Sequence, residues 1–90
     1  MNWFTYIVKG KDGSLYSGIT TDLLRRVSEH NTDAKKGAKS LRSKLPVTLV
    51  YYEAFISQAD ATRRERAIKR WKRDNKLKLI ERFNLNSIDF

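Results

Sequence analysis

The sequence predicts an α+β domain in which a small three-stranded antiparallel sheet is flanked by helices, in the order β-β-α-β-α-α. Two short apolar runs, residues 3–8 and 15–20, flank a polar segment that contains Asp12 and Gly13. Asp-Gly between such runs is a strong hairpin signal, because the turn needs a positive φ that glycine adopts without strain. A third β-rich run covers residues 47–55, and helical periodicity follows the second and third runs.

The first run is nearly all apolar from Trp3 to Val8, as expected for a strand that is covered on both faces. We therefore place it in the middle of the sheet. Side chains alternate between faces along a strand, so Tyr16 and Gly18 share one face of the second strand. Alternation alone leaves open the pairing register, which decides whether Tyr6 and Tyr16 meet.

The first helix is expected to start directly after the second strand. Thr21 or Asp22 can cap its N-terminus by accepting a backbone N–H. At about 100° per residue, Leu23, Leu24 and Val27 are expected to form its inward stripe.

Two functional side chains lie along one border of that stripe. Arg26 and His30 are four residues apart and therefore neighbours on the helix surface. Arg25 and Glu29 are expected to point nearly the opposite way, to solvent. The geometry thus selects Arg26 over Arg25. In a register that brings the tyrosines together, two tyrosines, an arginine and a histidine would line one shallow surface beside Gly18.

A polar segment over residues 31–44 is strongly basic and has Asp33 as its single acid. We expect a mobile loop with a short helical turn at residues 38–44, closed by Pro46. A solvated surface loop is the simpler interpretation. We favour a loop that contacts phosphate through Lys35, Lys36, Lys39, Arg42 and Lys44.

The second helix is predicted from about Gln58 to Arg73, with Ser57 as its N-cap. It carries many cations, but Glu65 falls within the inward stripe defined by Ala61 and Ile68. An unpaired buried carboxylate costs several kcal/mol. Glu65 therefore needs either a metal ion or a cationic partner, such as Arg26 or an arginine of its own helix.

A last helix is expected to begin at Asp74 or Asn75 and to turn Leu79, Ile80 and Phe83 inward. We place the domain at residues 1–84 and a C-terminal tail at residues 85–90. Trp71, between the two helices, either packs in the core or stacks on a nucleobase.

Composition limits the classes of function. The chain has 90 residues, a net charge of +9 and a pI of about 10.1. A clustered positive charge of this size indicates a polyanionic partner, most simply DNA, with RNA not excluded. The absence of cysteine excludes disulfides and thiolate zinc sites. No apolar run approaches the ~20 residues of a membrane span and no signal peptide is visible, so we expect a cytoplasmic protein without a membrane partner.

The candidate site residues follow a characteristic spacing along the sequence. Tyr16-Ser17-Gly18 follows Tyr6 by about ten residues and precedes Arg26 and His30 at the spacing Tyr-x-Gly-x7-Arg-x3-His. This pattern resembles the GIY-YIG nuclease family, in particular its small single-domain bacterial members. The sequence departs from the motif at Phe4-Thr5-Tyr6 and at Ser17, neither of which removes a catalytic residue type. The segment around Glu65 resembles the helix that carries the metal-binding glutamate of the family.

The resemblance implies a GIY-YIG-like fold and a metal-dependent endonuclease that hydrolyses phosphodiesters in DNA, in the repair or processing of branched or single-stranded DNA. It implies Mg²⁺ or Mn²⁺ as cofactor, with Glu65 as the metal ligand, because such ions need only one or two protein carboxylates. The candidate catalytic residues are Tyr6, Tyr16, Arg26, His30 and Glu65.

Individual roles follow from the chemistry of hydrolysis. Arg26 can bind a phosphate with its planar fork. We favour Tyr16 as general base and Tyr6 as its partner in positioning water, although the reverse assignment is open. His30 is either an acid/base group, a phosphate contact or a structural residue. Gly18 either lets phosphate approach closely or makes room for packing.

Two alternatives to an independent nuclease remain. One is a nucleic-acid-binding module with little catalysis, and the other is a subunit that a protein partner targets to its substrate. The chain is expected to be a monomer or a weak dimer. The candidate nucleic-acid contacts are Gly18, Lys35, Lys36, Lys39, Arg42, Lys44, Arg63, Arg64, Lys69 and Arg70.

Overall fold

The computed structural model describes residues 2–33 and 35–88, with side chains described through Asn84. Its sheet is antiparallel with the strand order β2-β1-β3. The elements in chain order are β1 (Trp3–Lys9), β2 (Leu15–Thr20), α1 (Leu23–Thr32), the 3-10 helix η1 (Lys39–Lys44), β3 (Thr48–Phe55), α2 (Gln58–Arg70) and α3 (Arg73–Ile88). The predicted α+β class, the element order and the central position of the first strand are confirmed.

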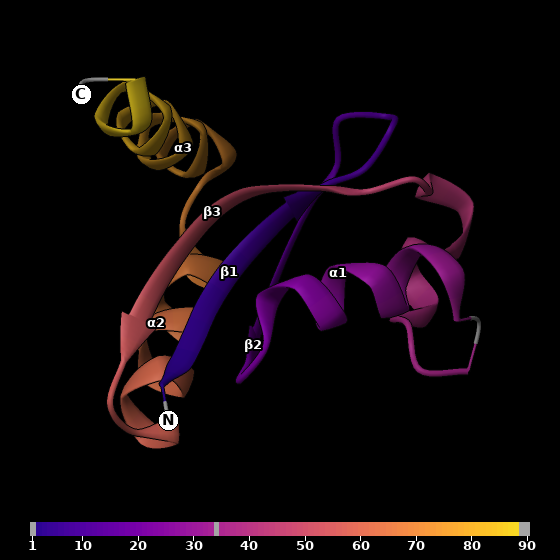
Figure 1. The fold of residues 1–90 in the computed structure, drawn as a ribbon. Coiled ribbons are helices and arrows are strands. Elements are labelled where there is room, and N and C mark those ends of the chain that lie inside the picture. Colours follow the sequence, from indigo (N-terminus) through magenta and orange to yellow (C-terminus); the bar gives the residue numbers. More distant parts are fainter. Residues whose placement is uncertain (1, 34, 89–90) are drawn as a thin grey trace.

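Helices cover both faces of the sheet. Figure 1 shows α1 on one side of β1 and α2 on the other, with α3 beside β3. Tyr6 and Val8 pack with residues of α1 and η1, whereas Ile7 packs against α2 and α3. Thr5, on the α2 face, donates a 2.7 Å hydrogen bond to the carbonyl of Ala61 and so ties α2 to the sheet. Burial on both faces explains the continuous apolar sequence of β1.

The register of the hairpin brings the two tyrosines to the same face. Tyr6 pairs with Gly18, and Val8 pairs with Tyr16. The turn sets this register, because Gly10 N–H donates to Ser14 O at 2.8 Å and Gly13 takes a φ of 87°. Tyr6 and Tyr16 are therefore diagonal neighbours beneath α1.

Helix α1 begins as expected, but its inward stripe is narrower than predicted. The side chain of Asp22 accepts the backbone N–H of Arg25, which confirms it as the N-cap. Leu23 and Val27 pack on the core, whereas Leu24 is 84% exposed. The prediction for Leu24 is wrong because it lies about 100° around the helix from Leu23, beyond the side that faces the sheet.

The two C-terminal helices differ from prediction in their bounds. Helix α2 begins at the Ser57 cap but ends at Arg70, where the extended backbone of Trp71 breaks it. Helix α3 then starts at Arg73 and continues to Ile88, into the segment expected to be a tail. Residues 89–90 of that tail lie outside the described residues, and the domain boundary at residue 84 stays a prediction. None of the helices within the described residues is long and apolar enough to cross a membrane.

Candidate active site

Tyr6 lies at the centre of the site and is almost completely buried, with 1% of its surface exposed. Its ring covers Gly18 on the neighbouring strand. A Cβ atom on Gly18 would lie 2.6 Å from the Tyr6 hydroxyl and 2.8 Å from its Cζ atom, closer than packed atoms approach. Gly18 is itself buried. The geometry therefore supports the packing role for Gly18, as the residue that makes room for the Tyr6 ring.

His30 holds the Tyr6 hydroxyl from the α1 side. It is 3% exposed, and its Nε2 lies 2.9 Å from the Tyr6 oxygen. Its Nδ1 accepts the backbone N–H of Ala38 at 3.2 Å. A neutral imidazole carries one proton, so Nδ1 as acceptor requires the proton to be on Nε2. His30 therefore donates to Tyr6, and this fixes the orientation of the phenol.

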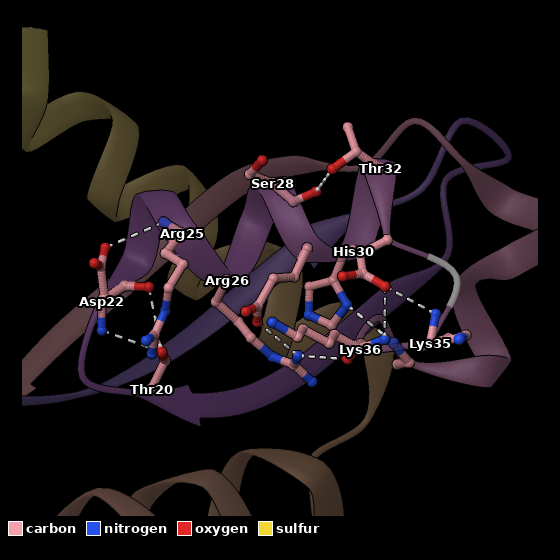
Figure 2. Close-up of polar contacts among 12 residues, drawn as sticks. Thr20, Asp22, Arg25, Arg26, Ser28, His30, Thr32, Lys35 and Lys36 are labelled. Carbon is pink, nitrogen blue, oxygen red and sulfur yellow. Dashed lines mark hydrogen bonds and ion pairs between the residues drawn. The ribbon is translucent and has the colours of Figure 1, made fainter.

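Arg26 is held at the open side of this pair. Its Nη1 donates to the Glu29 carboxylate at 3.2 Å and to the Lys36 carbonyl at 2.7 Å. Figure 2 shows Arg26, His30 and Lys36 together on one side of α1. Arg25 is exposed, so its predicted position in solvent is confirmed. The expectation that Glu29 points to solvent is wrong, because its side chain turns toward Arg26 and is 21% exposed.

The basic loop is anchored to α1. Asp33 accepts the backbone N–H groups of Lys35 and Lys36 at 3.0 and 3.1 Å, and Ala38 is bound to His30. The side chains of Lys35 and Lys36 remain exposed. The backbone of this loop therefore has defined hydrogen bonds, and it places Lys36 beside Arg26. The short helical turn expected there is confirmed as η1.

The environment of the two tyrosines differs. Burial raises the pKa of Tyr6 to about 12, and the nearby Tyr16 and Glu65 act in the same direction, whereas a hydrogen bond from Arg26 opposes them. Tyr16 is half-buried, and its ring lies edge-on to His30 with centroids 5.4 Å apart. Tyr6 is thus a protonated, enclosed phenol at neutral pH, and Tyr16 is the phenol that solvent can reach.

The pH dependence of folding should report on His30. Burial lowers its pKa below 6.5, and the charge of Arg26 adds to this effect while Glu29 opposes it. Because the unfolded chain binds a proton more readily than the folded chain, stability is full above pH ~6.5 and falls as the pH drops below it. We expect urea midpoints to decrease between pH 7.5 and 5.0, with a shallower slope in His30→Gln. Identical slopes would contradict this role.

Glu65 approaches the site from α2. Its side chain is 17% exposed, and its carboxylate lies 3.5 Å from the Nζ atom of Lys69, one turn along the helix. It is also close enough to Tyr6 to raise the pKa of that phenol. The expected inward position is confirmed in part, since Glu65 lies at the border of the buried stripe. The cation paired with it is Lys69, and neither Arg26 nor a helix arginine.

The predicted cations of α2 have different environments. Arg63 pairs with Asp60 at 3.0 Å and stays exposed. Arg64, a predicted nucleic-acid contact, is half-buried: it pairs with Glu53 at 3.4 Å and lies over the Trp71 ring at 5.1 Å. Trp71 packs against the core on the α2 face, as the packing alternative predicted.

Three contacts of the site, made by Glu29, Lys69 and the Ala38 backbone, were not predicted from the sequence. Glu29 and Lys69 stand at i+3 from Arg26 and i+4 from Glu65, spacings that themselves predict helical ion pairs. The Ala38 N–H that fixes His30 is a backbone group of a loop and leaves no signal in the residue type.

Residues 2–78 match the GIY-YIG catalytic domain family. The chain is 51% identical over 78 residues to a UPF0213 protein of Staphylococcus haemolyticus, an alignment that covers 87% of this chain and 93% of that protein. It is 48% identical over 79 residues to a UPF0213 protein of Desulfotalea psychrophila, covering 88% of this chain and 71% of that protein.

Solved structures show the same similarity. The solution NMR structure of a UPF0213 protein from Bacillus halodurans has a TM-score of 0.57 at 42% identity and covers 90% of this chain and 84% of its own. The solution NMR structure of the protein EF2693 from E. faecalis has a TM-score of 0.63 at 34% identity, covering 94% of this chain and 88% of its own. The similarity therefore extends over both the sheet and the helices that carry the site.

Proposed function

The chain belongs to the GIY-YIG family, whose domain is a nuclease domain, and on that premise we propose that it is a metal-dependent endonuclease that hydrolyses phosphodiesters in branched or single-stranded DNA. The observation that supports this most strongly is the convergence of Tyr16, Arg26 and Glu65 around the Tyr6–His30 pair. Binding alone needs neither an enclosed tyrosine–histidine pair nor a half-buried carboxylate.

Arg26 is suited to hold the scissile phosphate. Its bonds to Glu29 and to the Lys36 carbonyl involve Nη1, and a further bond goes to Tyr6, whereas a guanidinium has five N–H donors. Donors therefore remain for the non-bridging oxygens of a phosphate. A fixed cation that needs no rearrangement stabilises the charge that develops during attack.

Tyr16 is the better candidate for the general base. Tyr6, with a pKa of about 12 and 1% exposure, does not readily give up its proton or meet a water molecule. Tyr16 reaches solvent and lies against His30. We assign Tyr6 and His30 the role of positioning, in which the fixed tautomer of His30 orients the Tyr6 hydroxyl.

Glu65 is the side chain that would hold a divalent ion. Its carboxylate is half-buried and close to Tyr6, and its partner Lys69 is 52% exposed and free to swing away. Among the described residues, no cluster of three or more metal-ligating side chains exists. Mg²⁺ and Mn²⁺ accept such a site, because water and substrate phosphate complete their coordination. When bound, the ion neutralises charge on the leaving oxygen.

The cations of the loop and of α2 should bind the DNA backbone. Lys35, Lys36 and Lys39 are exposed in the segment that follows α1, and Arg66 and Arg70 are exposed on α2. If about five phosphates are neutralised, the logarithm of the binding constant should fall with the logarithm of salt concentration at a slope of about −4 to −5. Fluorescence anisotropy of a labelled oligonucleotide measures this slope, and a value near zero would contradict electrostatic binding.

A binding module without catalysis is the second candidate. The Glu65–Lys69 ion pair favours it, since a carboxylate satisfied by its own helix is also what a structural residue shows. The two candidates differ in whether the protein cleaves DNA at all and whether that cleavage depends on Glu65.

The proposal is tested by cleavage of a panel of branched, single-stranded and duplex DNA in Mg²⁺ or Mn²⁺. Arg26→Ala should lower cleavage by about 10²–10³-fold, as removal of a transition-state donor does in other enzymes. Arg25→Ala removes the same charge one residue away, at an exposed position, and serves as the matched control. Absence of cleavage on every substrate, or equal losses in the two variants, would contradict the proposal.

A further inference from the structure

A second basic hollow lies where α2 ends and α3 begins. The cavity measures about 300 Å³ and is lined by Arg64, Trp71, Asn75, Lys78, Leu79 and Arg82. Trp71 and Leu79 belong to the core on the α2 face, whereas the Tyr6–His30 pair belongs to the α1 face. The hollow is therefore separate from the candidate active site, and nothing in the proposed mechanism uses it.

One wall of the hollow is a planar aromatic surface. The Arg64 guanidinium lies 5.1 Å from the centre of the Trp71 ring, and Glu53 holds it there through an ion pair of 3.4 Å. Aromatic rings and guanidinium planes are the surfaces on which unpaired nucleobases stack. Because Arg64 is held in place from the sheet, this surface exists before a ligand binds.

The part of the lining that α3 contributes is cationic. Lys78 and Arg82 are exposed and lie one turn apart on α3, and Asn75 adds an amide on the same side of that helix. The lining contains no acid. Two cations with an amide beside an aromatic wall match a ligand that has both an anionic group and a planar ring.

The size of the hollow limits that ligand. Ligand pockets span roughly 300–1,000 Å³, so a cavity of about 300 Å³ takes one nucleotide and not a base pair. A base in a duplex also has both faces covered by its neighbours, which leaves none for Trp71. The chemistry and the size together select an unpaired nucleotide.

Helix α2 connects this hollow to the active site. Arg64 and Glu65 are adjacent in sequence and stand about 100° apart around the helix, on the two borders of the buried stripe at Ala61 and Ile68. The outer surface of α2 between these borders exposes cations, Arg66 and Arg70 among them. A single strand that crosses this surface meets Glu65 on one side and the hollow on the other.

We propose that the hollow binds one unpaired nucleotide of the strand that flanks the scissile phosphodiester, with the base against the Arg64–Trp71 pair and the phosphate on Lys78 and Arg82. The choice of nucleic acid as ligand rests on the proposed nuclease function. The site predicts that the enzyme prefers DNA with a single-stranded segment beside the cut over continuous duplex.

Binding can be followed by the fluorescence of Trp71. A Trp3→Phe protein leaves Trp71 as its one tryptophan, since the chain has two. We expect quenching by a short single-stranded thymidine oligonucleotide and, at higher concentration, by thymidine monophosphate. Thymidine without phosphate should quench less at equal concentration, and a blunt duplex should not quench. Response to the monophosphate alone would overturn the strand assignment.

Two variants, Lys78→Gln and Lys76→Gln, distinguish binding in the hollow from general electrostatic attraction between the protein and DNA. Both remove one charge from α3, but only Lys78 lines the hollow. Lys78→Gln should weaken oligonucleotide binding about three- to tenfold, whereas Lys76→Gln should change it less than twofold. Trp71→Leu should abolish the preference for single strands, provided that its circular dichroism shows a folded chain.

Two further results would overturn the inference. The first is oligonucleotide binding, measured by anisotropy, that leaves Trp71 fluorescence unchanged or is absent altogether. The second is an equal loss of affinity in the two lysine variants. These failures are distinct from failure of the nuclease proposal, which would appear as Trp71 quenching and selective loss in Lys78→Gln without cleavage of any substrate.

Discussion

Glu65→Gln is expected to lower metal-dependent cleavage by at least about a hundredfold, while DNA affinity stays unchanged or rises slightly. Glutamine keeps the shape of the side chain but removes the charge that a divalent ion needs. Loss of a negative charge next to bound phosphate also reduces repulsion. Cleavage is measured under single-turnover conditions, and affinity is measured by anisotropy without metal.

The structure predicts little change in stability for this variant. Glu65 pairs with Lys69, which is 52% exposed, so the lost ion pair belongs to the class worth about 0.3–0.5 kcal/mol. A buried pair with Arg26 would have cost about 3–5 kcal/mol on losing one partner. Thermal unfolding therefore separates the two arrangements, and a fall in melting temperature of many degrees would contradict the observed pairing.

Two controls complete the experiment. Glu81→Gln removes one negative charge from an exposed position of α3 and should leave cleavage unchanged. Lys69→Gln frees the Glu65 carboxylate from its ion pair, so calorimetry should show tighter Mn²⁺ binding than in the wild type. Unchanged cleavage in folded Glu65→Gln would remove Glu65 as the metal ligand, whereas the absence of cleavage in the wild type on every substrate would leave the binding module as the function.

The sequence predicted the parts of the site that depend on helical and strand periodicity. The angle of about 100° per residue separates Arg26 from Arg25, and the structure places Arg26 at the site with Arg25 in solvent. The Asp12-Gly13 pair predicted the hairpin turn, in which Gly13 takes a φ of 87°. These features are local, because each depends on residues within one or two turns of the chain.

Other features of the site depend on contacts that form only in the folded chain and could not be predicted from the sequence. The register that pairs Tyr6 with Gly18 depends on the hydrogen bonds of the hairpin, which alternation alone does not determine. The anchoring of the basic loop depends on a backbone N–H of Ala38 reaching His30. Helical periodicity predicts the direction of the Glu29 Cα–Cβ bond, which points to solvent, but not the course of its long side chain, which turns toward Arg26.

Gly18→Ala is expected to destabilise the protein by about 2–3 kcal/mol and to abolish cleavage. The added Cβ would lie 2.6 Å from the Tyr6 hydroxyl and 2.8 Å from Cζ, so the ring must move. Tyr6 has no space to do so, because it is 1% exposed and bound to His30 at 2.9 Å. For a domain of this size the melting temperature should fall by about 10–20 °C.

A double-mutant cycle with Tyr6→Phe tests the cause. Removal of the hydroxyl eliminates the 2.6 Å approach but keeps the ring, so Gly18→Ala should cost less in the Tyr6→Phe background than in the wild type. Additive losses of stability would show that the strain arises elsewhere. If Gly18 instead served to admit phosphate, Gly18→Ala would weaken DNA binding at an unchanged melting temperature, and that outcome would overturn the packing role. A stable, cleaving Gly18→Ala protein would also show that the Tyr6 ring can leave its position beside His30 without loss of function.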